Sequence, residues 1–202
     1  MIIENQTFDQ ERALYGLKDL TVKNCRFDGP ADGESAFKEC RNIDVAACFM
    51  NLRYPFWHVE KAKITSLKMK GKYSFQYDEN IEITDSELNT KDAFWHTKNV
   101  TVKNSIVKSE YLGWYSENLT LINCRIIGTQ PFCYCKNLLL KNCTMEECDL
   151  SFERSTVEVE VSGKIDSIKN PIEEKITADS IGQLIMEEEI CDESKTQIIC
   201  IE

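Results

Sequence analysis

A four-residue motif recurs along this chain at a constant spacing. It starts with asparagine at positions 42, 80, 99, 118 and 137, and related segments start at positions 61 and 156. An earlier copy starts at Asp19, and the stretch from Gly29 to Asp32 lengthens the spacing to the copy at Asn42. Units of one fixed length, here about 19 residues, stack on their neighbours and bury a continuous core between them. The sequence therefore predicts a solenoid.

The residues within each copy alternate between apolar and polar. In the copy that starts at Asn118, Leu119 and Leu121 are apolar and the intervening Thr120 is polar. Alternation with a period of two is typical of short β-strands with one buried face. A second short apolar segment precedes each motif, for example at residues 93–96, and no stretch of 10 residues is amphipathic with a helical period. We therefore predict an all-β fold, a single-stranded parallel β-helix with about 19 residues per rung.

A leucine-rich-repeat-like solenoid is the alternative fold. Residues 119–126 match half of the leucine-rich consensus. However, Asp78, Thr97 or Ser116 stands where that consensus places a leucine three residues earlier. The period of this chain is also below the usual range of about 20–29 residues for that class. Both differences favour the β-helix.

The chain is predicted to form one domain over residues 1–202. We expect an N-terminal cap and first rung in residues 1–18, regular rungs in 19–161, short terminal rungs in 162–186 and an acidic C-terminal cap in 187–202. Two similar segments start at Ile165 and Ala178, closer together than the regular copies, and predict narrower terminal turns. Caps are expected because the ends of a solenoid are open sheet edges.

The composition limits the partners of the chain. It contains 34 acidic and 24 basic residues and has a net charge of −10, so we expect no nucleic acid partner. No apolar run approaches the roughly 18 residues of a membrane span, and the N-terminus lacks the features of a signal peptide. We therefore expect a cytoplasmic protein that does not bind a membrane. No glycine-rich phosphate loop or nucleotide fingerprint occurs, so we also expect no cofactor.

The chain contains 10 cysteines, which we expect to be reduced in the cytoplasm. Cys25 and Cys48 fall in one inward column of neighbouring rungs, and Cys124 and Cys143 fall in the same column further along. Buried thiols of this kind pack as small apolar side chains. Residues 133–135 hold two cysteines separated by a single residue, whereas structural zinc sites usually need CxxC spacing and a second pair. We therefore predict no metal site.

The two histidines, His58 and His96, fall in one column two rungs apart, which is about 10 Å at the spacing of β-strands. They therefore cannot share one zinc ion at bond lengths of about 2 Å. Tyr77, Tyr115 and Tyr134 occupy the same column. We expect a ladder of stacked rings. The alternative is an acid–base role for either histidine, although no serine or cysteine partner can be identified by spacing.

The three tryptophans of the chain fall in the column next to the histidines. Phenylalanines 37, 56, 75, 94 and 132 fill the adjacent column on the other side. If the phenylalanines point inward, alternation turns the tryptophans outward, together with Tyr15 and Phe152. An exposed aromatic stripe is typical of a binding surface, whereas burial or a covering loop is the alternative. The predicted binding residues are Trp57, Trp95 and Trp114, flanked by His58, His96, Tyr77 and Tyr115.

Several segments resemble a known family. They include Glu11-Arg12-Ala13-Leu14-Tyr15, Asp92-Ala93-Phe94-Trp95, Tyr111-Leu112-Gly113-Trp114 and residues 34–39, 118–124 and 163–171. In these segments the chain is similar to a bacterial family of unknown function, the domain-of-unknown-function family numbered 3737, which is grouped with pectate-lyase-like right-handed β-helices. The likeness spans about residues 7 to 197. The resemblance implies that the β-helix is right-handed, and it implies no activity.

A relation to pectate-lyase-like proteins directs attention to paired carboxylates. Asp92 and Glu110 lie one rung and one column apart, near Lys72 and Lys91, and form the best such cluster. The Asp-Asp and Gly-His-Gly motifs of polygalacturonases do not occur. We therefore expect a non-catalytic binding or assembly module, whose aromatic stripe serves self-association, a protein partner or a saccharide. The alternative is a carbohydrate-binding or polysaccharide-active protein resembling a lyase or a hydrolase.

Overall fold

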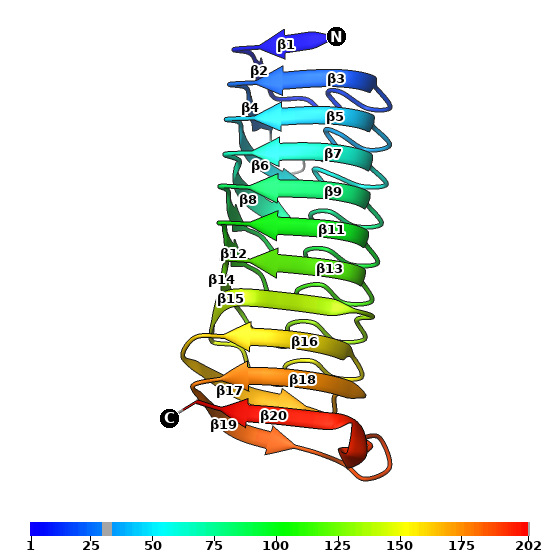
Figure 1. The fold of residues 1–202 in the computed structure, drawn as a ribbon. Helices are drawn as coiled ribbons and strands as arrows, with labels where there is room; N and C mark the ends of the chain where they lie inside the picture. The colour runs from blue at the N-terminus through cyan, green and yellow to red at the C-terminus, as the bar shows by residue number, and fades with distance from the viewer. Residues whose placement is uncertain (30–33, 202) are drawn as a thin grey trace.

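The protein is an elongated coil of parallel β-strands (Figure 1). The computed structural model describes residues 1–29 and 34–201, so most of the predicted long turn at Gly29–Asp32 lies outside the described residues. In Figure 1 the front strands run from right to left, the chain returns behind them, and each turn lies below the previous one. The coil is therefore right-handed. This confirms the predicted single-stranded right-handed parallel β-helix, and the alternative of a leucine-rich-repeat-like solenoid is wrong.

Two long parallel sheets and a side made of turns form the wall of the coil. The first, sheet A, contains β1 (Ile2–Glu4), β3 (Lys18–Lys23), β5 (Arg41–Ala46), β7 (Glu60–Thr65), β9 (Glu79–Thr84), β11 (Lys98–Lys103), β13 (Glu117–Ile122), β15 (Leu138–Glu146), β16 (Thr156–Val161), β18 (Glu173–Ala178) and β20 (Thr196–Cys200). The second, sheet B, contains β2 (Thr7–Phe8), β4 (Arg26–Asp28), β6 (Phe49–Arg53), β8 (Lys68–Lys72), β10 (Glu87–Asn89), β12 (Ile106–Lys108), β14 (Arg125–Ile127) and the C-terminal part of β15. Near the C-terminus, β17 (Lys164–Lys169) and β19 (Ser180–Ile185) form a separate pair, and a 3-10 helix, η1 (Glu193–Lys195), precedes β20.

The turns of the coil change length toward the C-terminus. Strand pairing joins residues 19 apart in the regular rungs, such as Lys98 and Glu117, but 17 apart at Thr156 and Glu173 and 16 apart at Lys164 and Ser180. The last turn is longer again, since Glu174 pairs with Thr196, 22 residues further on. Ile165 lies beside Ile181 and not beside Ala178, so the predicted match between the segments at Ile165 and Ala178 is wrong. Two similar tetrapeptides misled the alignment, because the hydrogen-bonded register, and not sequence identity, sets the length of a turn.

The backbone explains why asparagine starts most copies of the motif. The residues of this column from Asp19 to Asn137 have positive φ, from 52° at Asn42 to 62° at Lys61. Asparagine tolerates this left-handed conformation better than most residues. The side-chain amides also link successive rungs, since Asn118 Nδ2 donates to Asn99 Oδ1 at 2.8 Å and Asn137 Nδ2 donates to Asn118 Oδ1 at 3.1 Å. The repeated asparagine thus satisfies a backbone requirement and forms a ladder of hydrogen bonds.

A column of stacked phenylalanines lies inside the side made of turns. The ring centroids of Phe56 and Phe75 are 4.8 Å apart and those of Phe75 and Phe94 are 4.9 Å apart. Phe152 also joins this column, because it is fully buried and stacks on Phe132 at 6.0 Å. Its predicted place in the outward tryptophan column is therefore wrong. The rung that contains it is one residue longer than the period, as the bond from Cys135 N–H to Ser155 Oγ across 20 residues shows.

The remaining inward columns are aliphatic or carry thiols and hydroxyls. The 10 cysteines are free, and all except Cys200 are buried. The predicted thiol column is present, since the Cys25 amide donates to Cys48 Sγ at 3.4 Å between neighbouring rungs. Within the described part of the chain, no helix is long and apolar enough to cross a membrane.

Candidate binding face

Five rings form a continuous ladder along the side made of turns. They are His58, Tyr77, His96, Tyr115 and Tyr134, and consecutive ring centroids are 4.8 to 5.0 Å apart with interplanar angles of 2° to 17°. The predicted ladder of stacked rings is therefore confirmed. His58 and His96 lie two rungs apart with Tyr77 between them, so the structure does not bring the histidines together.

The ladder presents ring edges, and not ring faces, to solvent. Tyr77 is 44% exposed and Tyr115 is 45% exposed, although each has a ring stacked on both of its faces. The accessible groups are therefore phenol hydroxyls and imidazole nitrogens, repeated at the spacing of the rungs. Such a row can donate and accept hydrogen bonds along its length. It does not offer a flat ring at each rung for stacking on a sugar.

The tryptophans lie beside the ladder and are half-buried. The indole Nε1 of Trp95 donates to the Tyr111 carbonyl at 2.7 Å, and Nε1 of Trp114 donates to the Gln130 carbonyl at 2.7 Å. The rings of Trp95 and Trp114 stack at 5.5 Å. Trp57 lies apart from this pair, with Lys38 Nζ 4.1 Å from its ring centroid. The expected open stripe of three tryptophans is therefore replaced by one stacked pair and one separate ring.

The local backbone explains why the tryptophans are not fully exposed. Phe94 has a φ of 59° and His96 a φ of 54°, on either side of Trp95. Side chains alternate strictly between two faces only in extended strands. In this turn Phe94 points into the core and His96 points outward, while Trp95 lies along the surface between them. A parity argument for strands therefore does not apply to this column.

A groove of about 630 Å³ lies at the C-terminal end of the ladder. It is lined by Tyr115, Tyr134, Arg154 and Ile172, among others, and Ile172 is 41% exposed. Arg154 takes the place of the next ring. The Tyr134 amide donates to the carbonyl of Glu153, directly before Arg154, just as the Tyr115 amide donates to the carbonyl directly before Tyr134. Arg154 also has a φ of 53°, close to the 60° of Tyr134. Within residues 1–29 and 34–201, the rings near Tyr134 are Tyr115 on one face and Trp114 at an edge. The ladder therefore ends at Tyr134, which is half-buried and lines the groove together with Arg154.

The groove arises where wide and narrow rungs meet. Ile172 N–H donates to Ser155 O at 3.0 Å, which closes the side made of turns earlier than in the rungs above. Thr156 is paired with Glu173, and this shorter turn lacks the residues that would extend the ladder. Sequence reasoning placed Tyr134 in the ladder but missed Arg154 and Ile172. The signal that could have found them is the break in the regular period after Thr156.

The two carboxylates considered for catalysis lie in different environments. Glu110 is exposed and its carboxylate pairs with Lys91 Nζ at 2.9 Å. Asp92 is 7% exposed, and burial raises the pKa of its carboxyl while Lys91 opposes that rise. The cluster thus contains an ion pair next to a buried carboxyl. Within the described part of the chain, no three His, Cys, Asp or Glu residues are grouped as a metal site requires.

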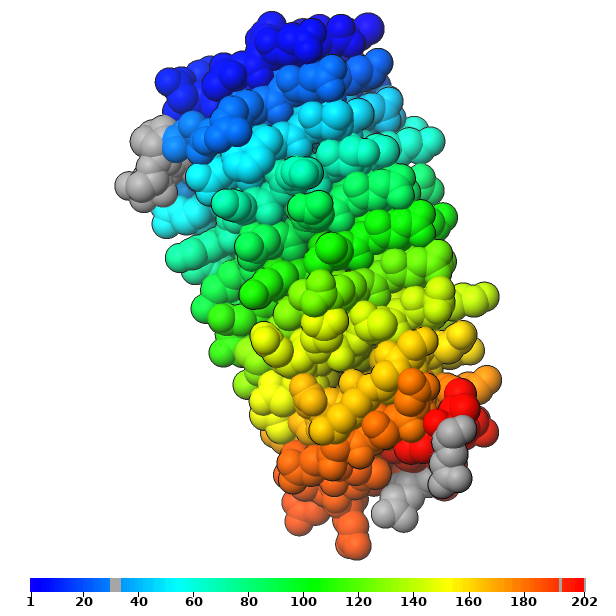
Figure 2. Space-filling view, turned by 90° about the vertical axis from the view of Figure 1, so that its left-hand side faces the viewer, coloured from blue at the N-terminus to red at the C-terminus, as the bar shows by residue number. Residues whose placement is uncertain are grey.

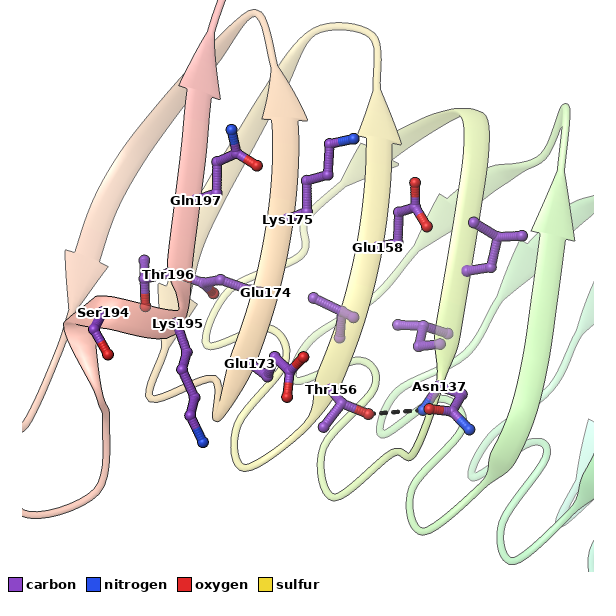
Figure 3. Close-up of a pocket in the computed structure, with 13 residues that line it drawn as sticks. Asn137, Thr156, Glu158, Glu173, Glu174, Lys175, Ser194, Lys195, Thr196 and Gln197 are labelled. Carbon is purple, nitrogen blue, oxygen red and sulfur yellow. Dashed lines mark hydrogen bonds between the residues drawn. The ribbon is translucent and has the colours of Figure 1, made fainter.

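A second hollow of about 670 Å³ lies on sheet A near the C-terminus (Figure 3). Glu158, Lys175 and Gln197 project from three adjacent strands along it. The strand of Lys175 also carries Glu174, which is 4% exposed and has no hydrogen-bond partner for either carboxylate oxygen. Burial raises the pKa of the Glu174 carboxyl to about 7. This side chain is a buried carboxyl group in the last turns and is not part of the aromatic face.

Comparison with known proteins identifies the family. A family model described as a protein of unknown function, DUF3737, matches residues 1–70 and 62–199. No curated protein matches the chain.

Proposed function

The chain belongs to the DUF3737 family of unknown function, and we propose that it is a non-catalytic module that binds a partner protein through the aromatic ladder and its groove. The observation that carries this proposal is the groove at the end of the ladder, which Tyr134, Arg154 and Ile172 line. In the middle of the ladder, at Tyr77, His96 and Tyr115, stacking already occupies both ring faces.

The chemistry of the groove specifies what it binds. An aromatic side chain of the partner enters the groove and packs against Tyr134 and Ile172, and a neighbouring carboxylate pairs with Arg154. The rest of the partner segment follows the ring edges of Tyr115, His96 and Tyr77, which supply hydrogen-bonding groups at each rung. The partner segment is therefore extended and combines an aromatic residue with an acidic group. A catalytic role is not supported, because Glu110 is engaged by Lys91.

Carbohydrate binding remains the alternative, and the ladder argues against it. Sugar rings stack on exposed aromatic faces, whereas stacking at 4.8 to 5.0 Å covers the faces within this ladder. A relation to pectate-lyase-like proteins stays a prediction from the resemblance.

Saturation-transfer NMR with small probes tests the proposal. N-acetylphenylalanine carries both groups that the groove requires, its amide derivative lacks the carboxylate, and N-acetylcyclohexylalanine lacks the aromatic ring. We expect N-acetylphenylalanine to give the strongest signal. Tyr134→Leu should raise its Kd about two- to tenfold, since an aromatic pair contributes about 0.5–1.5 kcal/mol, and Arg154→Gln should abolish the preference over the amide.

Tyr77→Leu is the matched control, because Tyr77 lies within the ladder and away from the groove. Binding that is unchanged in Tyr134→Leu would contradict the proposal. A signal from methyl glucoside that depends on Tyr134 would instead support the carbohydrate alternative.

A further inference from the structure

The outer face of sheet B is basic although the chain as a whole is acidic. Its net charge is −10, yet the outward positions of this sheet from β4 onward hold 7 basic and 3 acidic side chains. Figure 2 looks onto this side of the coil, where the rungs follow one another without a segment lying across them. The basic residues are Arg26, Arg53, Lys68, Lys70, Lys72, Lys108 and Arg125, and the acidic residues are Asp28, Glu87 and Glu146.

The three lysines of β8 are the centre of this face. All three are exposed, and no ion pair joins Lys68, Lys70 or Lys72 to a carboxylate within residues 1–29 and 34–201. We name them the lysine strand.

The neighbours of the lysine strand neutralise it only in part. Lys68 lies beside Glu87 in the adjacent strand, although no ion pair joins the two side chains. Lys70 lies between Asn51 and Asn89, and Lys72 lies beside Arg53, which is paired with Glu34. Like charges on adjacent strands repel one another. Lys70 does attract Asp28 and lowers its pKa, but Asp28 accepts stronger bonds from Asn51 and Arg26.

Several other exposed charges of the coil are paired between neighbouring rungs. Arg125 forms a two-point ion pair with Glu146, with bonds of 2.7 and 2.6 Å. Lys98 pairs with Glu79 at 3.8 Å. Cross-strand pairing of this kind is the usual arrangement on a solvated sheet. The lysine strand forms no such pair and concentrates three exposed lysines on one strand of a basic face, so its charge is available to a partner.

A complementary acidic surface is present in the same chain. Glu187, Glu188 and Glu189 are consecutive and exposed. Two hydrogen bonds shape this turn, since the amides of Ile190 and Cys191 both donate to the Glu187 carbonyl, at 2.8 and 3.0 Å. We name residues 187–189 the acidic turn.

The acidic turn is fixed to the end of the coil. The amide of Glu187 donates to Oδ1 of the fully buried Asn170 at 2.9 Å. Its three carboxylates form no ion pair with any described residue. The acidic turn is therefore preformed and presents three unpaired negative charges.

The two surfaces cannot meet within one molecule. β8 shares its rung with β7, and seven steps of strand pairing in sheet A lead from β7 to β20, the strand that follows the acidic turn. At about 4.8 Å per step this is more than about 30 Å along the axis. We therefore propose that the lysine strand binds the acidic turn of a second copy of this chain. The contact joins two different surfaces, so each copy can bind one neighbour at each of them.

Charge swapping tests this contact in the full chain. The variant K68E/K70E/K72E reverses the lysine strand, and E187K/E188K/E189K reverses the acidic turn. Each variant alone opposes like charges, whereas a mixture of the two restores opposite charges. The control K61E/K63E/K141E makes the same change in net charge as the first variant at exposed lysines of sheet A.

Sedimentation velocity over a range of concentrations supplies the measurement. At about 0.01 M salt, where the Debye length is about 30 Å, we expect the wild type and the control to associate. Each reversed variant should raise the dissociation constant more than about tenfold, and the equimolar mixture should recover association. About 0.5 M salt should dissociate the wild type, because the Debye length falls to about 4 Å.

Two results would overturn the proposal. One is a wild type that stays monomeric at low salt. If that monomer binds a polyglutamate probe through the lysine strand, the partner is another acidic protein and not a second copy of this chain. The other is a mixture of reversed variants that fails to associate while circular dichroism shows both to be folded.

Discussion

The rings of Tyr77 and His96 lie 5.0 Å apart, centroid to centroid, with planes within 2° of parallel. Both residues have nearly the same positive φ, 58° and 54°. Because corresponding residues of successive rungs share one backbone conformation, their side chains leave the backbone in the same direction. Stacking follows from the repeat, so each inner ring of the ladder stabilises two neighbours.

Replacing Tyr77 by alanine should therefore destabilise the fold by about 1–3 kcal/mol, since two ring contacts of about 0.5–1.5 kcal/mol each are lost. Tyr77→Phe retains both contacts and should be close to the wild type. Urea denaturation followed by circular dichroism measures the difference. An equal loss in both variants would mean that the hydroxyl, and not the stacking, stabilises this position.

Gly113 interrupts the column of phenylalanines and should resist substitution. It has a φ of 73°, and a Cβ there would lie 3.0 Å from both Phe132 Cδ1 and Leu119 Cδ2. Gly113→Ala should cost about 1–2 kcal/mol for the left-handed backbone and more for the crowding. Gly16→Ala is the matched control, because its φ of 68° is similar and nothing lies within 4 Å of its Cβ. Denaturation of both variants separates the two costs, and equal losses would show that Phe132 moves aside freely.

The repeat made the solenoid and the ring ladder predictable, whereas the functional surface depends on departures from the repeat. The constant spacing up to Thr156 fixes which residues share a column, and the inward phenylalanines and thiols follow from it. Phe152 was misplaced because one rung has an extra residue, which the sequence does not mark. The groove next to Tyr134 was missed because it depends on a shorter rung, which the sequence marks only by the break in the regular period after Thr156.

The side made of turns limited prediction for a different reason. Alternation predicts the direction of a side chain in an extended strand. Trp95 lies between two residues of positive φ, so its half-buried position could not be obtained by parity.

Asp78 carries a carboxyl group into the core and should make stability depend on pH. It is fully buried, its Oδ1 accepts a hydrogen bond from the Val59 amide at 2.8 Å, and its Oδ2 has no partner. Burial raises the pKa of this carboxyl well above its ordinary value of 3.8. The fold therefore favours the protonated form, and stability is lost as the pH rises above the ordinary value.

Asp78→Asn stays neutral at every pH and keeps an oxygen for the Val59 amide. We expect it to raise the free energy of unfolding at pH 8 by an amount on the order of 1–3 kcal/mol, the usual cost of an unsatisfied buried group, with a smaller gain at pH 5. Denaturant titrations at both pH values provide the measurement. A variant that is less stable than the wild type at both would show that the carboxyl makes a favourable contact that asparagine cannot replace.

Glu174 should produce a second pH dependence, in a range that its raised pKa defines. The side chain stands in an inward column between Val157 and Thr196 and is 4% exposed. Its pKa is raised by burial from 4.5 to about 7. The folded state therefore binds a proton more tightly than the unfolded state does. The stability that this group contributes is fully present below about pH 4.5 and is lost as the pH rises to about 7.

The loss amounts to at most about 3 kcal/mol, because one pKa unit corresponds to about 1.4 kcal/mol. Glu174→Gln cannot ionise, so its free energy of unfolding should fall less than that of the wild type between pH 4.5 and 7. Glu173→Gln provides the control, since Glu173 is the exposed neighbour on the same strand. Urea denaturation across this range measures all three proteins. Parallel pH profiles for the wild type and Glu174→Gln would mean that Glu174 reaches solvent and titrates as it does in the unfolded chain.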